Sequence, residues 1–457
     1  MNKTTILNNG YRLMNLRASL SLTIFILFTA LVAVAQAGEF VPRFGFQIES
    51  RSNVTRGNDS GLIRPVTADT VIEPYVGFLF TESIDKIKSE ISLQLDHQEY
   101  VDGTFSAQNF LSIDGFIDYE IIPGRFIWAT EDAANTRRIV LEDPGTPDNL
   151  QTFNVFTTGP DLFFTRGANE VVLKGRLGTA NYSDQLADNI RLLGSAALTR
   201  AVSPVMDISL NSTASFVRFD EEFQTDYDLY AFVARLDRDT PWGSLSLTGG
   251  YNVLDFESGF KENQPLIEGA LVIGKEDGAN SLTLSAASKF SDPALDVSDP
   301  DFTRLFQAGG LGTVDSNERA GTGATDTKRV EFNFDHRGDI YGFGLFGFSQ
   351  DIDRPVSTQN SQEEIGLGMN FNFAFTPNLT AWATYFQLET DFKNSDTHIE
   401  AMTPALGLNW ELQRNWFVSV GAKFEEETSN TAERNFEDEI VFVSLQYQAE
   451  SIESETE

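Results

Sequence analysis

The residues best suited to acid–base chemistry in this chain are its three histidines, His97, His336 and His398. A hydrolase would need one of them beside a nucleophilic serine and an acidic or amide partner. Each histidine lies at the end of a predicted strand or next to a turn, and no spacing groups them. The chain also contains no G-x-S-x-G elbow, no H-E-x-x-H pair and no phosphate-binding loop. We therefore expect no enzymatic activity and no bound cofactor.

Two short runs of acids lie on either side of the last predicted outer loop, at 425–427 (Glu-Glu-Glu) and 437–439 (Glu-Asp-Glu). Several carboxylates brought together could hold a calcium ion. A solvated acidic loop is the simpler interpretation, and we favour it, so the sequence predicts no metal site.

A third set of polar side chains alternates with apolar residues along the predicted strands. Successive residues of a strand point to opposite faces, so these polar side chains would share one face. Carboxylates, amines and amides that face a water-filled channel suit hydrated solutes that form hydrogen bonds, such as sugars. The predicted pore-lining residues are Glu90, Asp96, Lys174, Arg176, Asp207, Asn252, Glu331, Asp335, Asn370, Asn372 and Lys423.

The stretch 362–388 shows this alternation most clearly. Apolar residues occupy every second position from Ile365 to Phe375, with Gly, Asn and Ala between them, and Thr376-Pro377-Asn378 then predicts a short turn. An alternating segment of about 9 to 11 residues can cross a bilayer as a tilted strand. We expect Phe371 to face lipid and Asn370 to face the lumen.

The same hairpin pattern recurs along the whole chain. Nine short turns, of which Pro123-Gly124 is one, alternate with ten longer connections, and about 20 strands are predicted, within a range of 16 to 20. We expect an all-β fold, a transmembrane antiparallel up-and-down β-barrel, with the short turns and both termini on the periplasmic side. A soluble propeller or sandwich would not separate turn lengths so regularly.

Two of the longer connections stand out. The segment Glu131–Asn154 is predicted to be a long polar connection. The longest, Ser291–Lys328, has seven acidic residues against three basic ones. It could fold inward and narrow the pore, and a surface loop is the alternative that we favour slightly.

Residues 1–37 are predicted to be a signal peptide. Basic residues precede the apolar run Leu20–Val34, which ends in Ala35-Gln36-Ala37, a small-residue cleavage site. A membrane anchor is disfavoured because this run is too short to span a bilayer as a helix. We assign 38–447 to the barrel and 448–457 to an acidic C-terminal tail.

Charge and composition exclude several classes of protein. The chain has 33 Lys and Arg against 67 Asp and Glu, a net charge of −34, so nucleic acid is not an expected partner. Acidic loops suit a surface rich in divalent cations, and a generally solvated acidic face is the alternative. Cysteine is absent, which excludes a disulfide scaffold and a thiolate zinc site.

The segment 144–161 (Pro-Gly-Thr-Pro-Asp-Asn-Leu-Gln-Thr-Phe-Asn-Val-Phe-Thr-Thr-Gly-Pro-Asp) resembles the signature region of the exosortase/PEP-CTERM-associated outer-membrane β-barrel family. This family includes porin-like barrels of exopolysaccharide gene clusters. The segments 243–259 and 432–446 are similar to its strands. The resemblance implies an envelope barrel involved in polysaccharide export or surface-protein sorting, and implies no catalytic residue. Outer-membrane barrels usually end on an aromatic residue that the assembly machinery recognises, whereas here ten residues follow Tyr447.

We therefore expect a protein of the bacterial outer membrane. The first hypothesis for its function is a passive channel or export conduit for hydrophilic solutes. The alternative is a non-conducting envelope scaffold or assembly partner that acts through its loops. The expected partners are outer-membrane lipids and lipopolysaccharide, the barrel-assembly machinery, and a polysaccharide or other hydrophilic solute.

Overall fold

The computed structural model describes residues 38–58, 64–139, 145–183, 187–221, 224–274, 279–292, 324–355, 361–431 and 434–449. The predicted signal peptide and residues 450–457 of the predicted tail lie outside these ranges, as does most of the longest connection. Within the described residues no helix is long and apolar enough to cross a membrane.

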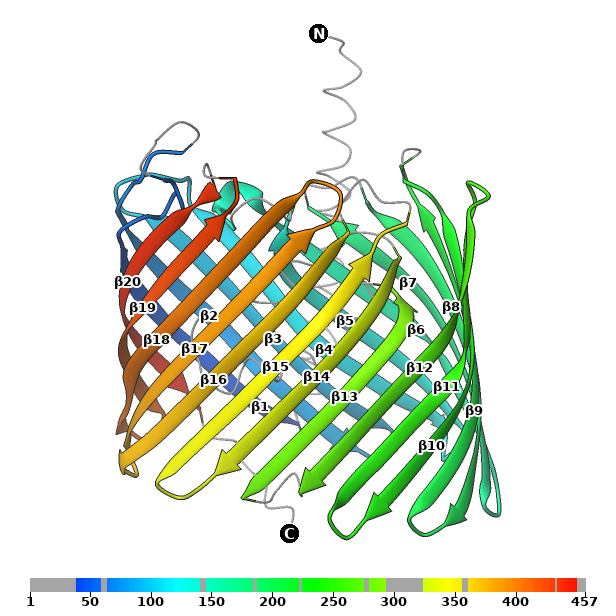
Figure 1. Cartoon of the computed structure of the whole chain (residues 1–457). Coiled ribbons are helices and arrows are strands. Elements are labelled where there is room, and N and C mark those ends of the chain that lie inside the picture. Colours follow the sequence, from blue (N-terminus) through cyan, green and yellow to red (C-terminus); the bar gives the residue numbers. More distant parts are fainter. Residues whose placement is uncertain are drawn as a thin grey trace, which may run out of the picture.

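Twenty β-strands make up nearly all of the described chain (Figure 1). The one helical element among the described residues is a short 3-10 turn, η1 (Pro147–Asn149). The strands are β1 (Glu39–Arg51), β2 (Asp69–Ile84), β3 (Ile87–Tyr100), β4 (Gln108–Ile122), β5 (Phe126–Arg138), β6 (Leu150–Arg166), β7 (Asn169–Tyr182), β8 (Asn189–Ser203), β9 (Met206–Phe219), β10 (Tyr227–Thr240), β11 (Gly243–Phe256), β12 (Lys261–Gly274), β13 (Asn280–Ser291), β14 (Thr325–Arg337), β15 (Tyr341–Asp353), β16 (Gln362–Thr376), β17 (Leu379–Phe392), β18 (Thr397–Gln413), β19 (Trp416–Ser429) and β20 (Phe436–Gln448).

Every strand pairs antiparallel with the next strand in sequence, and β20 pairs with β1 to close the sheet. In the closing pair Phe44 lies opposite Tyr447 and Ile48 lies opposite Val443. The strands are strongly tilted, as Figure 1 shows. The predicted all-β, up-and-down barrel is confirmed, and so is the predicted count of about 20 strands.

Connection lengths alternate as the sequence predicts. Eight of the nine even-numbered strands from β2 to β18 are followed by a turn of two or three residues, whereas the connections after odd-numbered strands have four residues or more. The exception is β12, whose five-residue connection to β13 is longer than those after β11 and β17. One expected connection has the wrong bounds: Glu131–Asn154 was predicted, but β5 continues to Arg138 and β6 begins at Leu150, so the connection is limited to 139–149. The polar side chains at both ends of the predicted range belong to strands, where every second residue faces the polar interior.

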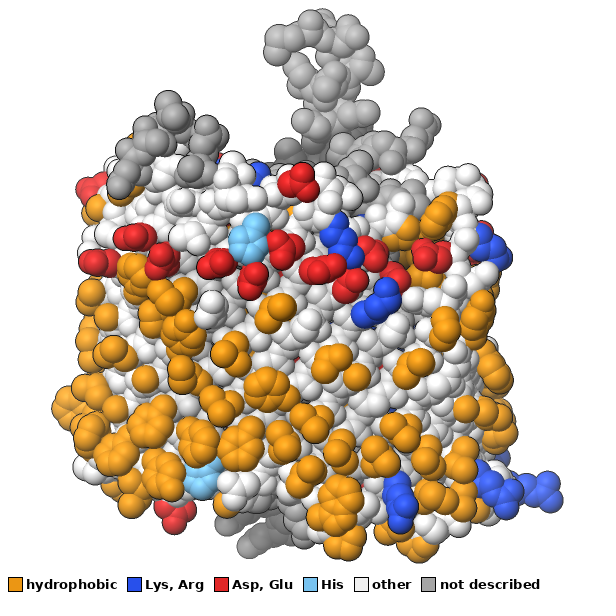
Figure 2. All heavy atoms as spheres, viewed as in Figure 1, with side chains coloured by type: hydrophobic (Ala, Val, Ile, Leu, Met, Phe, Trp, Pro, Cys, Tyr) orange, Lys and Arg blue, Asp and Glu red, His pale blue; other side chains and the backbone are white. Residues whose placement is uncertain are grey.

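The outer face of the barrel carries an apolar belt, seen in Figure 2. Ile365, Leu367, Met369 and Phe371 on β16 are 45–58% exposed, while the residues between them face inward. Exposed aromatic residues gather near the short turns, at Trp128, Trp242, Tyr341 and Trp410. A closed barrel with an apolar outer belt and an aromatic girdle is the architecture of bacterial outer-membrane proteins. The protein is therefore an outer-membrane β-barrel.

Part of the inner wall is aromatic rather than polar. A Cβ added to Gly368 would lie 2.1 Å from the ring of Phe346, and one added to Gly366 would lie 2.3 Å from the ring of Phe348. These rings come from β15 and cover the glycines of β16. The glycines of this hairpin were expected to line water, and the structure shows instead that they leave room for neighbouring rings.

Because one face of β16 contacts lipid and the other faces the barrel interior, a new charge should affect stability differently on the two faces. We expect Met369→Lys to destabilise the barrel by about 2–4 kcal/mol, because the ammonium would enter the lipid near the bilayer midplane. Asn370→Lys adds the same charge to the inner face and should change stability much less. Urea unfolding of barrels refolded into phospholipid vesicles, followed by tryptophan fluorescence, measures both. Equal losses in the two variants would contradict the assignment of faces.

Candidate functional site

The inner wall formed by β1–β3 and β18–β20 surrounds a cavity of about 410 Å³ near the outer mouth of the barrel. Strand alternation builds this wall: on β1 the exposed Phe44, Phe46 and Ile48 face lipid, so the residues between them face inward. The cavity is lined by carboxylates, amides, phenols and a few cations, among them Gln47, Glu49, Arg51, Glu73, Tyr75, Gln94, Asp96, Gln98, Tyr100, Lys423 and Glu425.

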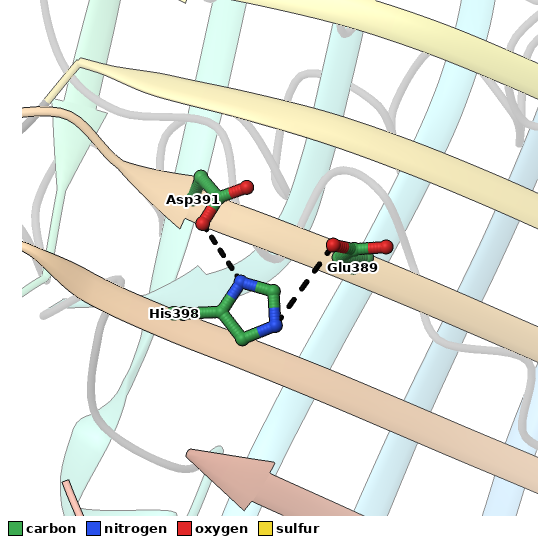
Figure 3. A group of neighbouring side chains, drawn as sticks. All are labelled: Glu389, Asp391 and His398. Atoms are coloured by element: carbon green, nitrogen blue, oxygen red, sulfur yellow. Dashed lines mark hydrogen bonds and ion pairs between the residues drawn. The ribbon is translucent and has the colours of Figure 1, made fainter. Parts of the chain in front are cut away.

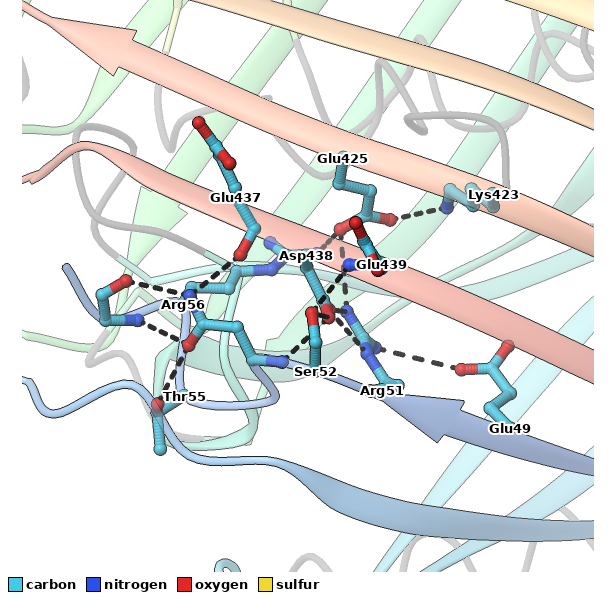
Figure 4. A network of polar contacts seen from close by, with 12 residues as sticks. Glu49, Arg51, Ser52, Thr55, Arg56, Lys423, Glu425, Glu437, Asp438 and Glu439 are labelled. Atoms are coloured by element: carbon cyan, nitrogen blue, oxygen red, sulfur yellow. Dashed lines mark hydrogen bonds and ion pairs between the residues drawn. The ribbon is translucent and has the colours of Figure 1, made fainter. Parts of the chain in front are cut away.

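A network of ion pairs lies beside this cavity, at the outer end of the β1–β20 closure (Figure 4). The guanidinium of Arg51 lies 2.7 Å from the Asp438 carboxylate and 3.5 Å from Glu425. Glu425 is also paired with Arg56 at 3.2 Å and with Lys423 at 2.5 Å. Because the Asp438 side chain has no exposed surface, its charge depends on these partners.

The same network fixes the first outer connection to β20. The Asn53 N–H donates to Asp438 Oδ1 at 2.9 Å, and the Asn53 side-chain amide donates to the Glu437 carbonyl at 2.9 Å. The favoured interpretation of the two acidic runs as a solvated loop is wrong for Glu425 and Asp438. Both are buried, and Arg51, Arg56 and Lys423 are their ion-pair partners.

A second ion-pair cluster lies on the inner wall of β5–β7 and contains two of the predicted residues. Arg176 forms a bidentate pair with Asp161, with contacts of 2.6 and 3.1 Å. Lys174 lies 3.7 Å from the same carboxylate, and Glu131 lies 3.7 Å from Arg176. Lys174 and Arg176 therefore face inward, but both are held in ion pairs.

The other predicted residues are distributed around the barrel rather than gathered at one point. Glu90 lines a neighbouring cavity of about 400 Å³, with Lys88, Asp114 and Asp118. Asp96 and Lys423 line the cavity at the mouth. Contact with a solute stays a prediction for each of them.

Five more predicted residues also lie on inward positions of their strands. Glu331 accepts a hydrogen bond of 2.9 Å from Arg329 Nε. Asp335 and Asn370 lie on either side of Gly344, where an added Cβ would be 2.9 and 2.6 Å from their side chains. Asn372 is paired in register with Trp382. Asp207 lies next to a short turn, opposite Ala201 and Asp237.

Asn252 also points inward, but only 1% of it is exposed. In its corrected amide orientation it donates to the Gln264 carbonyl and accepts from the Phe290 N–H. It ties β11 to β12 and β13 beneath a small apolar cluster that includes Leu254 and Phe256. Its role is structural, and direct contact with a solute is not available to it in this arrangement.

The start of the longest connection is anchored on the inner side of the barrel. Asp292, which directly follows β13, forms a buried ion pair with Arg191 of β8, and Tyr227 of β10 donates to the same carboxylate at 2.8 Å. Arg191 alternates with the exposed Ile190 and Leu192, so it faces inward. The root of this connection therefore enters the mouth, while residues 293–323 lie outside the described part of the chain.

Several inward residues were not predicted. Asp161 is the last residue of the stretch assigned to a family signature, and it is buried between the half-buried Pro160 and Leu162 along β6. The roles of Arg51, Arg191 and Asp292 depend on partners that are distant in sequence, so no local pattern could have indicated them.

No family model matches the chain, and no curated protein matches it. Among solved structures it is similar to the FrpB iron transporter from Neisseria meningitidis (F3-3 variant), with 9% identity and a TM-score of 0.46 over 92% of this chain and 82% of that chain. A mutant ferric enterobactin receptor (PfeA) from Pseudomonas aeruginosa gives 10% identity and a TM-score of 0.45 over 89% and 80%. The copper transporter OprC gives 9% and 0.45 over 90% and 81%. Similarity at this level supplies no argument about function.

The ion-pair network at the closure predicts a strong effect of a single charge. We expect Asp438→Asn to destabilise the barrel by about 3–5 kcal/mol, because Arg51 would keep a buried charge without its main partner. Glu437→Gln, at the exposed neighbouring position, is the matched control and should be close to neutral. Urea unfolding in vesicles reports both values. The double variant Arg51→Met/Asp438→Leu should recover much of the loss; a double variant as unstable as Asp438→Asn would contradict the ion-pair explanation.

Proposed function

We propose that the protein is a passive outer-membrane channel for uncharged hydrophilic solutes, with oligosaccharides as the solute class. The observation that carries this proposal is a set of glutamine–carboxylate pairs on the wall of the mouth cavity. The proposal contains no catalytic step.

Three glutamine side chains on β1 and β3 each donate a hydrogen bond to a carboxylate. Gln47 donates to Glu49 at 2.7 Å, Gln94 donates to Asp96 at 2.7 Å, and Gln98 donates to Glu73 at 2.9 Å. A glutamine amide has a second N–H and a carbonyl oxygen with two lone pairs. The wall therefore offers both donors and acceptors in fixed positions, which suits sugar hydroxyl groups because these also donate and accept.

The charges of the inner wall favour a neutral solute over a polyanion. Arg51, Lys423 and Arg176 are all engaged by carboxylates of the wall itself. An anionic polymer would have to break these pairs, and it would also meet the excess of acids in the chain. A link to exopolysaccharide export rests on the family resemblance alone, and a neutral polysaccharide is the form that this wall suits.

A second candidate function is a closed barrel that acts as an envelope scaffold or assembly partner. The anchoring of Asp292 to Arg191 and Tyr227 favours it, because this contact draws the start of the longest connection into the mouth. Lipopolysaccharide and the barrel-assembly machinery remain proposed partners under either function.

Single-channel conductance in planar bilayers tests the channel. We expect steady ion flow that added neutral oligosaccharide blocks. In Gln94→Ala/Gln98→Ala the concentration needed for half block should rise about tenfold, because two hydrogen bonds of about 0.5–1.5 kcal/mol each are lost. Gln387→Ala, on the exposed face of β17, is the control and should leave the block unchanged.

Two results would count against this proposal. A barrel that never conducts would favour the scaffold function. If the wild-type barrel conducts and oligosaccharides do not block it, the protein is a channel but oligosaccharides are not its solute.

Because Asp292 anchors the start of the longest connection to the inner wall, we predict that its removal changes the size of the pore. Asp292→Ala removes the carboxylate that Arg191 and Tyr227 bind, and we expect conductance to rise because the start of the connection is no longer anchored to the inner wall. The same bilayer recording measures it, with Gln387→Ala on the exposed face of β17 as the control. If Asp292→Ala conducts like the wild type, the connection does not narrow the pore.

A further inference from the structure

Acidic side chains form a band on the outer face of the barrel, above the apolar belt (Figure 2). Strand alternation places them on the same face as the exposed Ile365 and Leu406, toward the ends of the strands that carry the longer connections. On β15–β18 the band consists of Asp351, Asp353, Glu363, Glu389, Asp391 and Glu400.

Two side chains, Lys393 and His398, form ion pairs with these six acidic residues. Lys393 Nζ lies 2.5 Å from Asp351, 2.9 Å from Asp353 and 3.6 Å from Glu363. Burial lowers the pKa of Lys393, but the hydrogen bonds to Asp351 and Asp353 outweigh it and hold that pKa above its ordinary value. The remaining three carboxylates surround a histidine instead of a lysine.

That histidine is His398, and each of its ring nitrogens faces carboxylate oxygen (Figure 3). Nδ1 lies 2.7 Å from Asp391, while Nε2 lies 3.3 Å from Glu400 and 3.9 Å from Glu389. A protonated imidazole carries one positive charge against three negative ones. Within the described chain the cluster thus keeps at least two uncompensated negative charges.

We propose that His398, Glu389 and Glu400 bind a divalent transition-metal cation, and that Asp391 orients the imidazole. If the Nδ1–H donates to Asp391, the Nε2 lone pair faces the other two carboxylates. A carboxylate behind a metal-binding histidine is a common arrangement, because it fixes the ring and its tautomer.

The distances from His398 Nε2 to the two glutamates leave room for a metal ion where the Nε2 proton of a charged imidazole would lie. Zinc binds nitrogen and carboxylate oxygen at about 2.0–2.2 Å in tetrahedral geometry, so two of its ligands lie about 3.4 Å apart. The Nε2 separations of 3.3 and 3.9 Å from Glu400 and Glu389 bracket this value. Ligand atoms of Glu389, Asp391 and His398 lie within 4.8 Å of one another, so the orienting carboxylate belongs to the same cluster as two of the proposed ligands.

A separate observation is the space beside the cluster. A hollow of about 630 Å³ on the lipid face is lined by Ile267, Val330 and Ile365, and also by Glu389 and Asp391. Glu389, one of the three proposed ligands, therefore borders space for a further oxygen ligand of the ion. The imidazole favours zinc over calcium or magnesium, which prefer oxygen ligands alone.

Zinc binding to the purified, tag-free barrel in detergent tests this site, independently of the channel function. Isothermal titration with zinc chloride should give one ion per barrel, and His398→Ala should abolish it. His97→Ala and His336→Ala are matched controls that should still bind. Asp391→Asn should weaken binding about 10- to 100-fold, because it acts through the histidine. The shift between folded and heat-unfolded bands on a gel verifies that each variant is folded.

Competition with calcium separates this site from general attraction to the acidic band. We expect excess calcium chloride to leave zinc bound. The proposal is overturned if the wild-type barrel binds no stoichiometric zinc, if His398→Ala binds it as tightly as the wild type, or if calcium displaces it at equal concentration.

Discussion

Closure of the backbone hydrogen-bond ladder is the constraint on which the rest of this structure depends. In hydrocarbon an unpaired N–H or C=O group costs several kcal/mol, so a sheet can cross only if its first and last strands pair. Here that pairing joins β1 to β20 from Arg43 opposite Gln448 to Arg51 opposite Ile440. Beyond its outer end the Ser52 N–H still donates to the Glu439 carbonyl at 3.0 Å. The buried Arg51–Asp438 pair is placed where this ladder ends, and it holds the two strands together there.

Closure also explains how much of the fold the sequence could predict. Once every strand has lipid on one side and the lumen on the other, a period of two must appear along each strand. The first strand of the hairpin 362–388, β16, follows this pattern, and its faces were assigned correctly. On the returning strand β17 the large apolar residues Trp382, Phe386 and Leu388 are instead buried. The connection expected over Glu131–Asn154 was too long, because both of its ends belong to strands.

The candidate site was less predictable because its contacts are not local. Arg51 and Asp438 are 387 positions apart, and no short-range pattern indicates that they meet. The aromatic part of the inner wall was missed for a similar reason. Gly366 is compatible with a water-filled lumen in the sequence, and only the register with Phe348 of β15 shows that a ring occupies that space.

The excess of acids has different consequences on the two faces of the barrel. On the inner wall Glu425, Asp438 and Asp161 have arginine or lysine partners within 4 Å, so the barrel neutralises them with its own side chains. On the outer face three carboxylates share His398, whose single charge cannot balance them. The outer band therefore depends on cations from the surroundings in a way that the inner wall does not.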